Sequence, residues 1–270
     1  MPQKYQFERL PGPSDTLPES PCWHGLTHRL FWVDHGSRDL RAVKFPERDF
    51  VAVPLKTKGN LRFVKSLDAA HLIVGSERGL YRLEIETGML TAVGGTLPLT
   101  DQTCINDGAI HPNGAIAIAL SDIAEHAPTG GFYLLGPDGW TCILGEVVIG
   151  NGPAFSQDGS SLFLSDTLGQ RILRYDLATG KSEGFVDLSD GDGLPDGLFV
   201  SQSGDLWVSF WAGTRIEVVR DGKRIKRIGP TPGRNVTCCC LIGDAPNARA
   251  VTTICDSRET FENGTYQVTI

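Results

Sequence analysis

Side chains that carry oxygen atoms recur at an even spacing along the chain. Asn106, Asn151 and Asp196 open three similar phrases and lie 45 residues apart, and two steps further back the phrase LPESPCW contains Glu19. Carboxylate and amide oxygens are the donors that Ca²⁺, Mg²⁺ and Mn²⁺ prefer. Each residue alone could be an ordinary turn former, because Asn-Gly and Asp-Gly are common turn dipeptides. Their shared place in successive repeats favours a metal site.

The repeat that carries these residues is about 45 residues long, and six copies account for the 270 residues of the chain. Each copy contains about four short runs of apolar residues, most of them separated by Gly-containing turns, whereas helix-period patterns are almost absent. A period of roughly 40–50 residues with four strands is typical of a propeller blade. In the two remaining copies the opening position falls on Leu61 and on Cys239 or Cys240. The sequence therefore predicts an all-β, six-bladed β-propeller that forms a single domain over residues 1–270.

The ends of the chain and the opening residues have defined places in such a ring. The last copy holds only three strand-like runs, and KYQFERL near the start supplies a candidate for the fourth, which would close the ring and cover both sheet edges. The innermost strand of each blade lines the central channel of a propeller. We therefore expect Glu19, Asn106, Asn151 and Asp196 to converge on the channel axis. Two carboxylates grouped there without a cation would suppress each other's ionisation.

The composition limits the partners and the location. Hydrophobic residues make up 40% and charged residues 21% of the chain, which is typical of a soluble globular protein. The net charge is −7 and no basic run is present, so we expect no nucleic-acid partner. No apolar run of about 18 residues and no signal-peptide pattern occurs, so we expect no membrane contact and a cytoplasmic location. The seven cysteines include no C-x-x-C pair, and we expect reduced thiols that are mostly buried.

Motifs in a specific order connect the chain to a known family. E-x-P-x-W begins at Glu19, N-D-G at Asn106, N-G-P at Asn151, and P-D-G contains Asp196. Together they resemble the gluconolactonase/regucalcin-like family, also called the senescence-marker-protein family, over nearly the whole chain. The resemblance implies a six-bladed propeller that hydrolyses lactones, mainly sugar lactones, with one divalent ion (Ca, Zn, Mn, Mg or Fe). It also implies that Glu19, Asn151 and Asp196 bind the metal, that Asn106 contacts the substrate or a bound water, and that Asp107 supports the loop.

These assignments lead to an expected reaction. The metal polarises the lactone carbonyl, and Asp196 or a metal-bound hydroxide activates the attacking water. Asn106 is expected to donate a hydrogen bond to the substrate or the water. The partner is then a small-molecule lactone, and the protein is expected to be a monomer or a homodimer.

One position departs from the family pattern. Many relatives carry Arg two residues before the N-D-G asparagine, where it binds substrate oxygens, and here that substrate-binding position is Cys104. Asp122, Glu125 and His126 lie on the loop after the third copy's second strand and could compensate, although a solvated loop is the simpler interpretation. Cys104 and an abbreviated last blade keep two alternatives open. One is a related propeller esterase or phosphotriesterase, and the other is a non-catalytic metal- or ligand-binding propeller.

Overall fold

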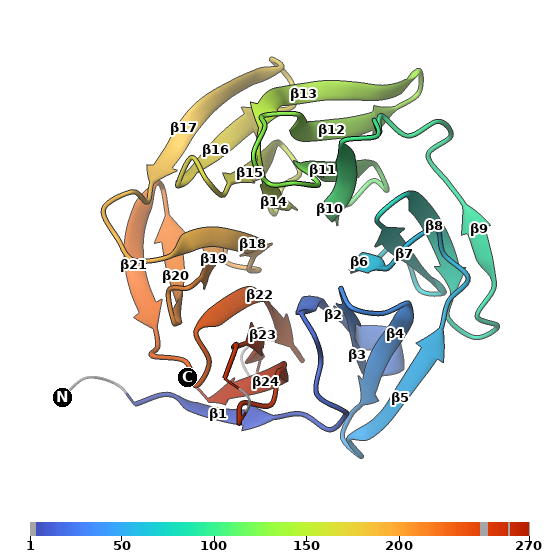
Figure 1. Ribbon diagram of the computed structural model, residues 1–270, viewed down its shortest axis with the longest axis vertical. Helices are drawn as coiled ribbons and strands as arrows, with labels where there is room; N and C mark the ends of the chain where they lie inside the picture. The colour runs from blue at the N-terminus through green and yellow to red at the C-terminus, as the bar shows by residue number, and fades with distance from the viewer. Residues whose placement is uncertain (1–3, 244–247, 259, 270) are drawn as a thin grey trace.

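Six antiparallel sheets form a closed ring in the computed structural model, which describes residues 4–243, 248–258 and 260–269 (Figure 1). Each sheet has four strands, so the predicted six-bladed β-propeller is confirmed. Among the described residues, no helix is long and apolar enough to span a membrane. The division of the chain into one domain over residues 1–270 stays a prediction.

Successive stretches of the chain form the first five blades, each as a meander from the innermost to the outermost strand. Blade one contains β2 (Pro18–His24), β3 (Arg29–Asp34), β4 (Asp39–Lys44) and β5 (Asp49–Pro54). Blade two contains β6 (Leu61–Ser66), β7 (His71–Ser76), β8 (Gly79–Glu84) and β9 (Leu90–Ala92). Blade three contains β10 (Thr103–Ile110), β11 (Ile116–Asp122), β12 (Gly130–Gly136) and β13 (Gly139–Val147).

The other blades repeat this order. Blade four contains β14 (Gly150–Phe155), β15 (Ser161–Asp166), β16 (Arg171–Asp176) and β17 (Lys181–Asp187). Blade five contains β18 (Leu194–Val200), β19 (Leu206–Trp211), β20 (Arg215–Arg220) and β21 (Lys223–Ile228). Blade six contains β22 (Asn235–Ile242), β23 (Arg249–Cys255), β24 (Gly264–Thr269) and, from the other end of the chain, β1 (Gln6–Arg9).

The sixth blade closes the ring with both ends of the chain. β1 pairs antiparallel with β24, with Gln6 opposite Thr269 and Arg9 opposite Tyr266. The predicted N-terminal closing strand is therefore confirmed. The pairing supplies the backbone hydrogen bonds that would otherwise be missing along the edge of β24.

The hydrophobic core lies between neighbouring blades rather than in the channel. Phe31 and Val33 of blade one pack with Leu72 and Val74 of blade two, for example, and comparable clusters join other neighbours. Outer strands such as β5 are largely exposed. Because side chains between the blades hold the ring together, the residues that line the channel are free to be polar.

Every innermost strand has an irregularity near its channel-lining residues. The pairing register shifts after Glu19, Leu61, Ile105, Asn151, Pro195 and Val236. In blade two the extra residue is Arg62, while Leu61 is fully buried in the core. The expectation that Leu61 opens blade two towards the channel is therefore wrong, because a one-residue bulge turns its neighbour inward instead.

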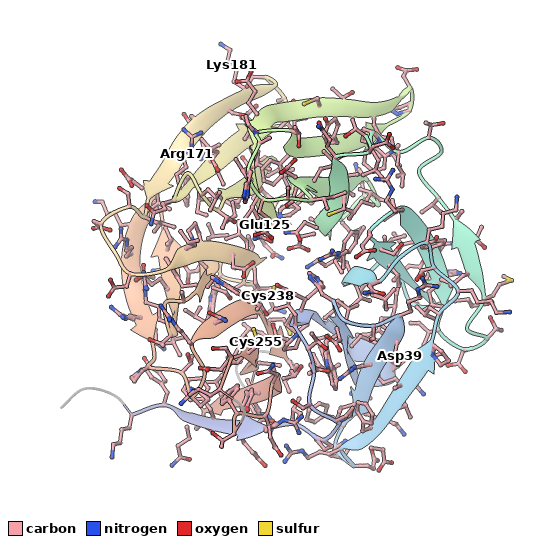
Figure 2. All side chains as sticks on the ribbon, in the orientation of Figure 1. Asp39, Glu125, Arg171, Lys181, Cys238 and Cys255 are labelled. Carbon is pink, nitrogen blue, oxygen red and sulfur yellow. The ribbon has the colours of Figure 1, made fainter. Side chains whose placement is uncertain are left out.

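The same reason corrects the opening residue of blade six. Its register shift lies between Val236 and Cys238, whereas Cys239 and Cys240 belong to core clusters. Six of the seven cysteines are buried and all seven are free thiols, as expected from the sequence. Figure 2 places Cys238 on the inner side of the ring and Lys181 on its outer edge.

Candidate active site

Two buried carboxylates face the channel from different blades. Glu19 on β2 and Asp196 on β18 are 7% and 5% exposed. Burial raises the pKa of Glu19 to about 8, and the negative charge of Asp107 adds to the rise. Burial also raises the pKa of Asp196 well above its usual range, and the charges of Glu19 and Asp107 act in the same direction. Glu19 and Asp107 therefore both lie close enough to Asp196 to disfavour its ionisation.

A chain of hydrogen bonds orients the two amides beside these carboxylates. Asn106 Nδ2 donates to Asn151 Oδ1 at 2.7 Å and to the Gly150 carbonyl at 3.0 Å. Asn151 Nδ2 donates to Thr167 Oγ1 at 3.0 Å, and that hydroxyl donates to the Pro195 carbonyl at 2.9 Å. The chain links blades three, four and five and ends on the residue before Asp196. It fixes both ends of the Asn151 amide and leaves Asn106 Oδ1 without a hydrogen-bond partner among the described residues.

This arrangement changes what Asn106 can do. Both hydrogens of its Nδ2 are already donated within the protein. The expected hydrogen bond from Asn106 to substrate or water is therefore not available in this geometry. Its Oδ1 can instead accept a hydrogen bond or approach a cation.

Asp107 has a larger part in the site than support of its own loop. Its Oδ1 accepts a hydrogen bond from the Gly108 backbone N–H at 2.7 Å, and its Oδ2 accepts one from Gly152 N–H at 3.1 Å, which ties blade three to blade four. Lys65 Nζ lies 3.6 Å from Asp107 Oδ1. Burial alone would lower the pKa of Lys65, but neighbouring acidic groups, Asp107 foremost, raise it above its usual value, so Lys65 is a cation beside the carboxylates.

A small pocket opens beside the amides. It has a volume of about 210 Å³ and is lined by Arg62, Glu77, Arg78, Cys104, Asn106 and Glu125, among others. Cys104 is 9% exposed, and burial raises the pKa of its thiol, so it contributes a neutral group. Asp122 also lines the pocket, but its carboxylate accepts hydrogen bonds from Thr129 Oγ1 and the His126 backbone N–H, which shape the loop. The pocket is smaller than a drug-sized cavity and suits a small ligand.

The donor set agrees with an oxygen-preferring divalent cation. No three His, Cys, Asp or Glu side chains among the described residues gather closely enough to hold one ion by themselves. An ion held by Glu19 and Asp196 would therefore need a further oxygen donor such as an amide, and Asn151 Oδ1, fixed by the hydrogen bonds of its amide, is a candidate. A bound cation would also offset the repulsion and burial that raise the pKa of both carboxylates.

Comparison with known protein families assigns the chain to one of them. Residues 17–255 match the family described as the SMP-30/gluconolactonase/LRE-like region. The chain belongs to this family. The resemblance inferred from its motifs is thereby confirmed.

Individual relatives agree with this assignment. L-arabinolactonase of Azospirillum brasilense is 30% identical over 241 residues, which cover 85% of this chain and 79% of that protein. The pentonolactonase XacC of Haloferax volcanii is 28% identical over 91% of this chain and 84% of its own length. The structure of regucalcin from Agrobacterium tumefaciens, described as a calcium-binding protein, is 24% identical, with a TM-score of 0.86 over 98% of this chain and 94% of that one. That structural likeness supports the fold.

Sequence reasoning missed several residues of the site. Arg62 and Lys65 come from blade two, which contributes no oxygen-bearing residue to the repeated phrase. Thr167 follows β15 and has no counterpart in the spacing. The unusual Arg-Phe-Val-Lys run at residues 62–65, with two basic residues in an otherwise apolar inner strand, was the signal available in the sequence.

Proposed function

We propose that the chain is a metal-dependent lactonase that opens small sugar lactones. Glu19, Asn151 and Asp196 would hold one divalent ion, with Ca, Zn, Mn, Mg and Fe as the candidates. The observation that carries this proposal is the pair of buried acidic groups whose pKa values are raised beside an oriented amide oxygen. Membership in a family that includes a protein named L-arabinolactonase agrees with it.

The reaction needs a polarised carbonyl, an activated water and a proton for the leaving alkoxide. A divalent ion at this site would polarise the carbonyl and lower the pKa of a coordinated water. Asp196 accepts the proton of the attacking water and returns it to the ring oxygen as the carbon–oxygen bond breaks. Asn106 Oδ1 accepts a hydrogen bond from a substrate hydroxyl, and Cys104 borders the same substrate pocket. Lys65 pairs with Asp107, whose other oxygen accepts the Gly152 N–H and so ties blade three to blade four beside Asn106.

The free thiols, most of them buried, are compatible with a reducing compartment, and we retain the cytoplasmic location as part of the proposal. The expected partner is the small-molecule substrate, and the oligomeric state, monomer or homodimer, stays a prediction.

A substrate panel with and without a chelator tests the function. The purified protein is assayed for acid release from aldonolactones, simple carboxylic esters and a phosphotriester, before and after EDTA treatment and after return of each candidate ion. We expect lactone hydrolysis that EDTA removes and one or more ions restore. Turnover of the other esters alone would indicate the related esterase or phosphotriesterase. Metal or lactone binding without any turnover would indicate a non-catalytic propeller.

A further inference from the structure

The small pocket contains few free hydrogen-bond donors for a substrate. Asn106 Nδ2 has donated both of its hydrogens, and Cys104 offers only a weak neutral S–H group. Ser121 Oγ is within hydrogen-bond distance of both the N–H and the carbonyl of Gly150. Arg78 Nη1 donates to the Thr100 and Thr103 carbonyls, both at 2.7 Å. The lactone ring and its hydroxyls nevertheless expose oxygen atoms that need donors.

Two guanidinium groups in the pocket lining keep donors for a ligand, Arg62 and Arg78, and of these Arg62 is the one on an inner strand, β6. It lines the same pocket as Asn106 and Cys104, and its side chain is 20% exposed. One Nη1 hydrogen goes to His35 Nδ1 at 3.0 Å, and one Nη2 hydrogen goes to Glu77 Oε1 at 3.0 Å. Arg62 Nε has no hydrogen-bond partner among the described residues. A guanidinium carries five N–H donors, so hydrogens on both terminal nitrogens remain for a ligand.

The groups that hold Arg62 make it a fixed donor. His35 Nε2 lies 2.8 Å from the Arg62 carbonyl and its Nδ1 lies 3.0 Å from the guanidinium. Because Nδ1 receives an arginine hydrogen, the proton of the neutral ring is on Nε2, which donates to that carbonyl. Glu77 holds the other side. A side chain fixed in this way loses little conformational freedom when it binds a ligand.

We propose that Arg62 binds the oxygen atoms of the substrate. This guanidinium on blade two would take the place of the arginine that many relatives carry on blade three, where this chain has Cys104. The bulge of β6 turns Arg62 towards the pocket just as the bulge of β10 does for Asn106. This inference rests on the proposed lactonase function. It adds a specificity-determining residue that the motif comparison did not predict.

The charges around Arg62 indicate the class of lactone. Glu77 lies 3.0 Å from Arg62. Arg78 adds a second positive charge to the pocket lining, and Asp122 and Glu125 add two carboxylates, so acidic groups outnumber basic ones by three to two. An anionic substrate would meet these carboxylates, whereas hydroxyl groups can donate to them and accept from Arg62. The pocket therefore fits an uncharged aldonolactone better than the lactone of a sugar diacid, which keeps one free carboxylate.

Moving the guanidinium between blades tests the proposal. kcat and KM for glucono-1,5-lactone are measured for the wild type, Arg62→Ala, Arg62→Lys and the double variant Arg62→Ala/Cys104→Arg, with melting temperatures as the control for folding. We expect Arg62→Ala to raise KM about 10- to 100-fold, as loss of a charge-assisted hydrogen bond predicts, with a smaller change in kcat. The double variant should have a KM at least tenfold lower than that of Arg62→Ala. Lysine should recover less, because it cannot present a fork of donors.

Arg174→Ala is the matched control, since Arg174 pairs with Glu183 on outer strands of blade four and should leave KM within twofold. If Arg62→Ala does not fold, Arg62→Lys carries the comparison. A KM within twofold of wild type in Arg62→Ala, or a loss that arginine at position 104 does not restore, would overturn the proposal while the wild-type rate upholds the lactonase. A wild type that opens no lactone would overturn both.

Discussion

The channel has a cavity of about 660 Å³ where its inner strands finish and a pocket of about 210 Å³ where β6 and β10 begin. Residues from all six inner strands line the larger cavity, and many of them are apolar, including Trp23, Phe155, Phe199 and Leu241. The smaller pocket is lined by arginines, carboxylates and an amide. Of the two, the smaller one opens at the end that carries Glu19, Asn151 and Asp196.

The larger of the two cavities is therefore not the one with most of the charged groups. The larger cavity is lined mainly by apolar side chains, which supply few groups for acid–base chemistry. Burying acidic groups together costs free energy, and the raised pKa values of Glu19 and Asp196 show where the fold bears that cost. Lys65 joins the two regions, since it lines the larger cavity and lies 3.6 Å from Asp107. We therefore assign reaction chemistry to the smaller, charged end.

The largest expected effect comes from removing a carboxylate at the charged end. Asp196→Asn should lower kcat/KM for a lactone by at least about a thousandfold, because loss of a general base and a cation ligand combine. The melting temperature should stay the same or rise without added metal, because a buried amide avoids the cost of a buried carboxylate. Initial rates and thermal unfolding measure the two effects.

Asp205→Asn is the matched control in the same blade. Asp205 accepts hydrogen bonds from Arg220 Nε at 2.6 Å and Nη2 at 2.8 Å, so its loss should lower the melting temperature by a few degrees and leave turnover intact. Retention of most of the turnover in Asp196→Asn would remove Asp196 from the proposed mechanism.

The repeated phrase predicted much of this structure for a physical reason. One phrase per blade places equivalent residues around one axis, so the ring, its closure by β1 and the inward positions of Glu19, Asn151 and Asp196 could be inferred from spacing alone. The bulges could not, because a single extra residue leaves the apolar pattern almost unchanged while exchanging which side chain faces inward. The spacing therefore predicts Leu61 at the opening of blade two, whereas the bulge places Arg62 there. The spacing did not predict Thr167, because this residue follows the second strand of blade four and lies outside the opening position of the repeat. It reaches the site through its hydroxyl, which accepts a hydrogen bond from Asn151.

A smaller effect should appear in the acid stability of the charged end. Burial and the charge of Arg62 lower the pKa of His35 to about 3 from 6.5, so the folded state keeps this ring neutral. A lowered histidine pKa gives stability that is complete above the unfolded value and is lost as pH falls from about 6.5 towards 3. Between pH 6.5 and 5 the loss should amount to about 1–2 kcal/mol.

His35→Gln, which keeps an acceptor for Arg62, should flatten this part of the pH profile. Urea unfolding of both proteins at pH 7, 6 and 5 isolates the contribution of His35 from that of the carboxylates that both share. Equal losses of stability in the two proteins between pH 7 and 5 would show that His35 is free to protonate in the folded state.

The smallest effect on activity is expected at the apolar end. Phe199 lines the larger cavity and packs against two core clusters, so Phe199→Leu should lower stability by about 1 kcal/mol, or about 2–4 °C in melting temperature. The rate constants for a lactone should change less than twofold, because no group that holds substrate, cation or proton is altered. The two variants should therefore have opposite effects: Asp196→Asn loses activity and keeps stability, whereas Phe199→Leu loses stability and keeps activity. A tenfold fall in kcat/KM for folded Phe199→Leu would instead mean that substrate reaches the carboxylates through the wide cavity, and the two ends would form a single site.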